Sequence, residues 1–216
     1  MPSRAVALLS ALLCVAFGAA FAALAHTHTP TAAAVEEGLL VAAHVEAPQA
    51  PLDWSPVQLS ARTKTSGCSA RGPYPDPACT PGAIFASTTL EALCAPGYTQ
   101  KVRNVSTTLK RRVYAEYGVA YPEPGGTYEA DHLIPLELGG SNDIANLFPE
   151  AASPAPGFRE KDLVENYLHQ EVCAARAALP RAQEEIAHDW VAVYESLTQD
   201  QLAELKAEFR NWSNPN

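Results

Sequence analysis

Apolar residues recur at helical spacing in three stretches of the second half of the chain. The first stretch runs from about Phe158 to Ala178, and its apolar positions fall on one face of a helix. A second helix is predicted from Pro180, and a third follows Thr198, which forms a capping box with Gln201. On the first helix the opposite face carries a polar stripe, made of Asp162, Asn166, His169 and Cys173. The apolar faces predict a helical core, and the polar stripe predicts a different neighbour.

A shorter pattern precedes these helices, over residues 129–150. The pair Asp131-His132 lies in a first short run, two glycines follow as a turn, and Asn146 opens a second apolar run. This order predicts a strand, a polar loop and a second strand arranged around a histidine. For Asp131 and His132 to act together, the backbone must turn there, as it does where a strand ends, because neighbours on a strand face opposite sides.

The first 66 residues differ in composition from the rest. Residues 1–25 combine one positive charge, a long apolar run and the small-x-small sequence Ala23-Leu24-Ala25, which predicts a signal peptide and a secreted or periplasmic protein. The apolar run is also long enough to span a bilayer, so an uncleaved N-terminal anchor is the alternative. Residues 26–66 are rich in Ala and Pro without periodicity and predict a flexible linker. One domain, residues 67–216, remains.

Removal of the signal peptide leaves an even number of cysteines, namely Cys68, Cys79, Cys94 and Cys173. In an exported chain, an even number predicts disulfides, here two. A zinc knuckle is the rival interpretation, but no C-x2-C pair exists and the spacings do not suit a structural zinc site. Of the three connectivities, loop length favours Cys68 with Cys79 and Cys94 with Cys173.

The net charge of -9 is unusual for a protein that binds nucleic acid, because phosphate binding calls for basic surface. Basic residues do gather in an acid-free segment, residues 101–112, which overlaps the first part of a helix predicted from its N-cap Ser106 through Tyr117. A cutting enzyme also needs carboxylates to hold its metal. The net charge therefore argues against tight, sequence-specific binding to nucleic acid, but it does not exclude a nuclease.

The stretch from 129 to 150 and the polar stripe together suit phosphodiester cleavage, which needs a base for water and a cation for the phosphate. His132 suits the base because imidazole titrates near neutrality. Asp131 and Asp162 offer carboxylates to a hard cation such as Mg²⁺. Asn146 can bond the backbone of the loop and so fix the histidine. Three arginines are candidates for the phosphate, with nothing in their spacing to choose among them: Arg103, Arg111 and Arg159.

At this point the residues resemble a known family. Asp131-His132, the apolar run to Pro135, the sequence GGSN and the pair Asn146-Leu147 resemble the HNH endonucleases of the His-Me finger, or ββα-metal, superfamily. The sequences KDLVENYLHQEVC, AQEEIAHDWVAVY and PGYTQKVRNVSTTLKRRVYAEYG are similar to those of a bacterial, often exported, HNH-like branch.

The resemblance implies an α+β fold, in which a small ββα-metal finger of a β-hairpin and a helix sits within a mainly helical, disulfide-stabilised domain. It implies His132 as general base, Asp131 as first metal ligand and Asn146 as the asparagine that orders the loop. The final ligand maps onto Asp162, with Glu165 and His169 in reserve. The chain departs from the family pattern because no histidine lies at the usual short distance after Asn146.

The leading hypothesis is therefore an exported, monomeric DNA endonuclease with little sequence preference and one divalent metal, Mg²⁺ or alternatively Mn²⁺ or Zn²⁺. A catalytically inactive HNH-like module that binds nucleic acid or protein outside the cell is the second hypothesis. A disulfide-stabilised calcium-binding module is a third, but it leaves His132 without a role. The sequence does not distinguish DNA from RNA, because base and ribose contacts come from surfaces that it does not place.

Overall fold

The computed structural model describes residues 56–209. The predicted signal peptide or anchor, the linker up to residue 55 and residues 210–216 lie outside the described part of the chain. Within residues 56–209, no helix is both long and apolar enough to cross a membrane.

The described residues form a mixed fold of helices and short strands, which confirms the coarse fold class. Strands pair in two separate two-stranded sheets, β1 with β2 and β3 with β4, both antiparallel. In chain order the elements are β1 (Pro56–Gln58), β2 (Ala83–Phe85), α1 (Leu90–Leu93), α2 (Tyr98–Val102), α3 (Thr107–Glu116), β3 (Tyr128–His132), the 3-10 turns η1 (Leu136–Leu138) and η2 (Ile144–Asn146), β4 (Leu147–Ala151), α4 (Phe158–Cys173), α5 (Leu179–Ser196) and α6 (Gln199–Glu208).

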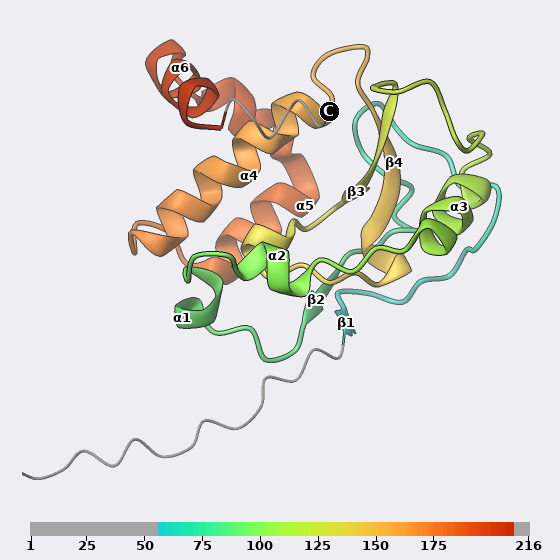
Figure 1. Ribbon diagram of the computed structural model, residues 1–216, viewed down its shortest axis with the longest axis horizontal. Helices are drawn as coiled ribbons and strands as arrows, with labels where there is room; N and C mark the ends of the chain where they lie inside the picture. The colour runs from blue at the N-terminus through green and yellow to red at the C-terminus, as the bar shows by residue number, and fades with distance from the viewer. Residues whose placement is uncertain (1–55, 210–216) are drawn as a thin grey trace, which may run out of the picture. The chain divides into compact units, whose positions relative to one another are not determined.

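The hairpin of β3 and β4 confirms the predicted strand, loop and strand. It lies between α3 on one side and α4 on the other (Figure 1). Because side chains alternate along a strand, Tyr128 and Ala130 pack with the apolar cluster of α3, while Glu129 and Asp131 belong to the opposite face, which α4 approaches. The loop between the strands carries both 3-10 turns.

The core lies between α4, α5 and the η1 segment, as the helical periodicity predicts. Val164, Leu168 and Val172 of α4 pack against Ile186 and Trp190 of α5, and all five are at most 2% exposed. The predicted capping box of Thr198 and Gln201 opens α6. Helix α4 ends at Cys173, before the predicted Ala178, because Ala175 adopts a left-handed conformation with φ of 56°.

Both disulfides that loop length favoured are present, Cys68–Cys79 and Cys94–Cys173. The first joins two turns of an irregular segment, and the second links the end of α1 to the end of α4 across a sequence separation of 79. Disulfides are typical of proteins that fold in an oxidising extracellular or periplasmic environment.

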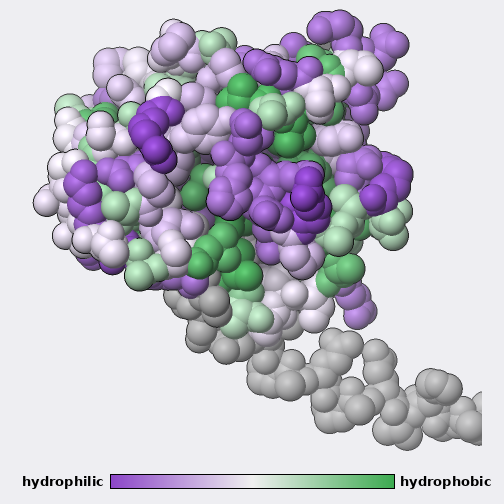
Figure 2. All heavy atoms as spheres, turned by 180° about the vertical axis from the view of Figure 1, so that it is seen from behind, coloured by the Kyte–Doolittle hydropathy of each residue, from purple (hydrophilic) through white to green (hydrophobic). Residues whose placement is uncertain are grey.

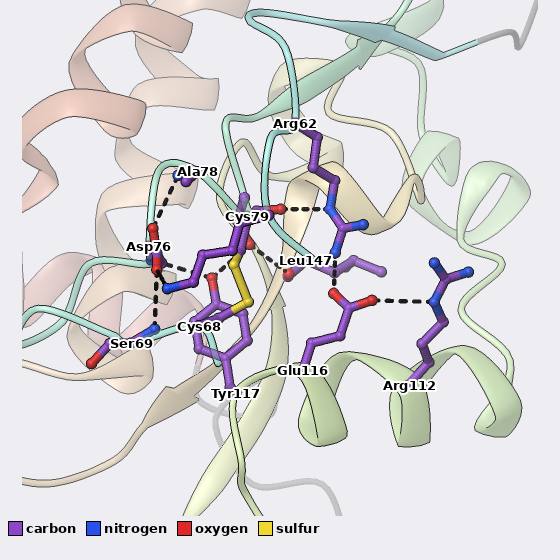
Figure 3. Close-up of a disulfide and its surroundings, with 12 residues drawn as sticks. Arg62, Cys68, Ser69, Asp76, Ala78, Cys79, Arg112, Glu116, Tyr117 and Leu147 are labelled. Atoms are coloured by element: carbon purple, nitrogen blue, oxygen red, sulfur yellow. Dashed lines mark hydrogen bonds and ion pairs between the residues drawn. A yellow bond between two sulfur atoms is a disulfide. The ribbon is translucent and has the colours of Figure 1, made fainter. Parts of the chain in front are cut away.

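The segment around the first disulfide corrects the predicted domain boundary (Figure 3). Arg62 donates a hydrogen bond of 2.7 Å to the carbonyl of Cys79 and pairs with the buried carboxylate of Glu116 on α3. Lys64 pairs with Asp76 at 2.9 Å. Residues 56–66, which the sequence assigned to the linker, therefore belong to the folded unit. Composition did not reveal this because the partners of these residues are distant in the chain.

The surface shows no single dominant apolar face in the view from behind, where hydrophobic residues form separate patches between hydrophilic ones (Figure 2). Among the described residues, the large hydrophobic side chains that are exposed are Leu59 and Leu90. The expected monomer stays a prediction.

The loop between β3 and β4 depends on its two glycines. Gly139 has a φ of +77°, and a Cβ on Gly140 would lie 1.7 Å from the carbonyl oxygen of Ile134. The amide of Gly140 donates to the carbonyl of Pro135 at 2.9 Å, so the backbone passes too close to itself for any side chain.

Replacing Gly140 by alanine is expected to destabilise the protein by about 3 kcal/mol, because the loop must open to admit the methyl group. The matched control is Gly125→Ala, where the added Cβ meets nothing within 4 Å; its free energy of unfolding should change by less than about 0.5 kcal/mol. Urea denaturation of both variants measures the difference, and equal stabilities would contradict the close approach.

Candidate active site

A cleft with a volume of about 220 Å³ lies between the end of β3 and the first turns of α4. It brings the Asp131-His132 pair together with side chains of the α4 polar stripe and with one arginine. Its lining consists of Arg103, Glu129, Asp131, His132, Pro135, Leu136, Glu137, Asp162, Glu165 and Asn166. Five of these ten residues carry a carboxyl group.

Asp131 and His132 both line this cleft although they are neighbours on a strand. Strand β3 ends at His132, and the Asp131 Oδ1 atom accepts a hydrogen bond of 2.7 Å from the backbone amide of His132. The turn that the sequence required at the end of this strand is therefore confirmed. Both side chains are mostly buried, with exposures of 8% and 4%.

The tautomer of His132 follows from its contact with Asn142. Asn142 donates through Nδ2 to the carbonyl of Val102 at 2.7 Å and accepts at Oδ1 from the amide of Asn104 at 3.2 Å. These two bonds identify Oδ1 as an acceptor. The His132 Nε2 atom lies 3.3 Å from this Oδ1, so Nε2 carries the proton and Nδ1 keeps its lone pair.

His132 is a neutral imidazole at physiological pH. Burial lowers its pKa to about 4, outweighing the opposite effect of the Asp131 charge. A neutral ring with a bare Nδ1 is the form that accepts a proton, which a general base requires.

Asn146 fixes the loop that carries the histidine. Its side chain is fully buried and makes four hydrogen bonds to backbone groups: Oδ1 accepts from Ala83 and Ile134, and Nδ2 donates to Ile134 and Ser141. The predicted contact of Asn146 with the backbone of the loop is thus confirmed. Because all four positions of the amide are used, Asn146 positions the loop and has no capacity left for a ligand.

Lys161, on the first turns of α4, joins this helix to the end of β3. Its side chain is fully buried, and its ammonium donates to Asp131 Oδ2 at 2.8 Å, to the carbonyl of His132 at 2.7 Å and to Glu165 Oε1 at 2.5 Å. All three ammonium protons are therefore used. Burial alone would lower the pKa of Lys161, but the surrounding carboxylates hold it well above its ordinary value.

The same ion pair keeps Asp131 ionised. Burial would raise the pKa of its carboxyl, but Lys161 overrides this and holds the pKa at about 2. Glu150 behaves differently: burial raises its pKa well above the ordinary value, and the nearby charge of Asp131 adds to the effect although Lys161 opposes it. Both carboxyl oxygens of Glu150 are buried without a hydrogen-bond partner among the described residues, which agrees with a raised pKa.

The remaining acids of the cleft resist ionisation, because they are buried and lie close to one another. Asp162 has its pKa raised to about 8, by burial first and then by repulsion from Asp131 and Glu129. The pKa of Glu129 is also raised, again mainly by burial and then by Asp131. Among the described residues, no hydrogen-bond donor contacts the carboxyl groups of Glu129, Glu137 or Asp162. Such repulsion between hard oxygen donors is what a bound divalent cation relieves.

The candidate ligands on α4 separate into two groups. Asp162 and Asn166 lie one turn apart and both line the cleft. Asn166 donates through Nδ2 to the carbonyl of Asp162 at 2.7 Å, which leaves its Oδ1 oxygen for a ligand. Glu165 also lines the cleft but is held by Lys161. His169, the other reserve ligand, lies away from this lining, with its Nε2 atom 3.3 Å from Cys173 Sγ.

Of the three candidate arginines, Arg103 lines the cleft. It is exposed and forms no ion pair within residues 56–209. The guanidinium of Arg111 instead lies over the ring of Tyr121, 6.0 Å from its centroid, and that of Arg159 lies 4.6 Å from the centroid of Phe158. Arg103 is therefore the arginine positioned to meet a ligand in the cleft.

The sequence interpretation missed several residues of this site. Asn142 stood in the GGSN sequence without an assigned role, and Asn166 stood in the polar stripe without being chosen as a ligand. The spacing of Lys161 and Glu165, four residues apart on a helix, is a usable signal for an ion pair. Nothing in the sequence signalled that the lysine would be fully buried, or that Glu129 and Glu137 would face the same cleft.

Replacing Lys161 by methionine is expected to destabilise the protein by about 3–5 kcal/mol, because the buried carboxylate of Asp131 would lose its counter-charge. Lys206→Met, at an exposed position of α6, is the matched control and should change the free energy of unfolding by less than about 0.5 kcal/mol. Urea denaturation followed by circular dichroism measures both. If the free energy of unfolding changes by a similarly small amount in both variants, the ion pair contributes little to stability.

Comparisons with family models, with curated proteins and with solved structures gave no match to this chain. What the cleft can do therefore follows from its own side chains.

Proposed function

We propose that this chain is a metal-dependent endonuclease that hydrolyses phosphodiester bonds in nucleic acid. One observation carries the proposal: a neutral histidine with a bare Nδ1 shares a cleft with oxygen donors from both a strand end and a helix. Asp131 and His132 come from β3, and Asp162 and Asn166 come from α4. A base beside a set of hard ligands is the combination that hydrolysis of a phosphodiester needs.

The donor set fits a hard divalent cation such as Mg²⁺ or Mn²⁺. Asp131, Asp162 and the Oδ1 atom of Asn166 offer oxygen ligands, and the repulsion among the acids favours a cation over an empty cleft. When bound, the cation would neutralise charge on the scissile phosphate. Zn²⁺ is the less suitable alternative, since it prefers nitrogen and sulfur ligands.

The protein's own groups supply the other requirements. His132 accepts a proton from the attacking water at Nδ1, while Asn142 holds the ring by accepting from Nε2. Arg103 is exposed at the cleft and offers a guanidinium to the phosphate. Asn146 keeps the loop in place, and Lys161 orients the carboxylate of Asp131. Each of these groups orients an atom before substrate arrives, which is the condition for efficient catalysis.

The hairpin of β3 and β4 followed by α4 corresponds in this proposal to the ββα-metal finger of the HNH resemblance. DNA is the proposed substrate, with low sequence specificity, because the acidic chain offers little basic surface for base-specific binding. The disulfides agree with an exported enzyme.

The first test is cleavage of plasmid DNA, single-stranded DNA and RNA by the purified protein, with Mg²⁺, Mn²⁺, Zn²⁺ or EDTA. Cleavage is expected with Mg²⁺ and should stop in EDTA. His132→Ala should lower the rate by about 10²–10⁴-fold, because the general base is lost.

His188→Ala is the matched control, since His188 is exposed on α5 and lies outside the cleft. It should cut like the wild type. If no cation supports cleavage of any substrate, the enzymatic proposal is wrong, and a gel-shift assay then tests the catalytically inactive binding module instead. Cutting that persists in both EDTA and His132→Ala would assign the activity to another site.

The second test identifies the ligands on α4 by calorimetric titration with Mg²⁺. Asp162→Asn and Asn166→Ala should each weaken binding by about tenfold or more, because each removes an oxygen donor or its charge. Glu184→Gln, which removes an exposed acid of α5, should leave the affinity unchanged. Equal affinities in all four proteins would exclude Asp162 and Asn166 as ligands.

A further inference from the structure

A second cluster of metal-ligating side chains lies at the far end of α4. His169 and Cys173 stand one turn apart on this helix, and Cys94 follows α1. One ligand atom from each of the three, an imidazole nitrogen or a sulfur, lies within 4.8 Å of the others. None of the three lines the candidate active site.

The chemistry of this cluster differs from that of the cleft. Two thiolates and an imidazole are soft donors that select Zn²⁺ and similar cations, whereas the oxygen donors of the cleft select Mg²⁺. In the structure Cys94 and Cys173 form a disulfide, and the ligand of a metal is the thiolate, so the oxidised cluster has only the imidazole to offer.

We propose that Cys94, His169 and Cys173 form a redox-gated site for a thiophilic divalent cation such as Zn²⁺. A dithiol reductant transfers two electrons and two protons to the Cys94–Cys173 bond and is itself oxidised to a disulfide. The bond between the two sulfurs breaks, and each becomes a thiol. The cation then displaces the two thiol protons to solvent and takes the Nε2 lone pair of His169.

The fold keeps the three ligands together after reduction. Leu93, next to Cys94, is 1% exposed and packs in the same core cluster as Leu168 and Val172 of α4. The Cα atoms of Cys94 and Cys173 are 5.7 Å apart in the structure. The packing of Leu93 against α4 does not depend on the disulfide, so it holds α1 against α4 after reduction. The two thiols therefore remain neighbours.

His169 already faces the sulfur of Cys173. Its Nε2 atom lies 3.3 Å from Cys173 Sγ, an ordinary hydrogen-bond distance to sulfur, and 3.4 Å from the carbonyl of Leu93, which is long for a hydrogen bond to oxygen. The site is also open to solvent, because Cys173 is exposed and the other two residues are partly buried. Reductant and cation can both reach it, and three protein ligands leave a fourth position for water.

A cation here would replace one cross-link by another. The disulfide joins α1 to α4 in the oxidised protein, and the metal would join the same two elements in the reduced protein. The inference is independent of the proposed nuclease activity, because it concerns other residues, another class of cation and another observable.

Co²⁺ tests the proposal, because thiolate ligation gives a near-ultraviolet charge-transfer band that oxygen ligands of the cleft cannot produce. The full chain is titrated with Co²⁺ before and after reduction by a phosphine. The band is expected only after reduction. It should be lost in Cys94→Ser and in Cys173→Ser, and His169→Ala should weaken the apparent affinity by about tenfold or more. His188→Ala is the control and should leave both unchanged.

A second measurement needs no variant. Reduced wild-type protein is alkylated with and without Zn²⁺, and the modified cysteines are mapped by mass spectrometry. Zn²⁺ should protect Cys94 and Cys173 from alkylation. The alkylation of Cys68 and Cys79 should be the same with and without Zn²⁺. Absence of the cobalt band in the reduced protein, a band that survives both cysteine substitutions, an unchanged affinity in His169→Ala, or protection of Cys68 and Cys79 alone would each overturn the proposal.

Discussion

The ammonium of Lys161 holds the two halves of the candidate active site together. Its three hydrogen bonds reach a carboxylate of β3, the backbone carbonyl of the next residue and a carboxylate of α4. A fully buried cation is stable only where such partners surround it, and buried carboxylates equally need a cation nearby. The hairpin and the helix therefore define each other's position, because neither can move away without leaving an unpaired charge in the interior.

Neutral side chains position the other parts of the candidate active site. Asn142 and Asn146 use their amides to fix a histidine ring and a loop, and neither adds charge to a cleft that already holds several acids. This division matters for chemistry near a phosphate. The two asparagines set the geometry, while the acids that line the cleft remain as oxygen donors for a cation.

The sequence predicted the parts of this arrangement that depend on local pattern. The apolar periodicity found α4, α5 and their core faces, the Gly-Gly turn and Asn146 found the loop, and the loop lengths found both disulfide pairs. It did not find what depends on tertiary contact. The hydrogen bond from His132 to Asn142 and the ion pair of Arg62 with Glu116 depend on how separate segments of the chain pack. The burial of Lys161 concerns a residue type that composition would place at the surface.

The separation of Asp162 from His169 shows the same limit. Both belong to one polar stripe on one helix, and the periodicity treats them alike. Their surroundings differ because α4 passes from the hairpin at its beginning to α1 at its end, so residues two turns apart face different neighbours. A polar stripe in the sequence shows which side of a helix is polar. The packing of the helix decides whether the residues of the stripe belong to one site or to several.

Helix α4 is fixed in register at both ends, by Lys161 under β3 and by Cys173 against α1. One inserted or deleted residue between these points would turn everything beyond it by about 100° and shift it by about 1.5 Å along the axis. No compensating slip is possible, because each end is held by a different partner. The number of residues in this segment is therefore expected to be the most strictly kept length in the domain, whereas the exposed loop between β4 and α4 is free to lengthen or shorten.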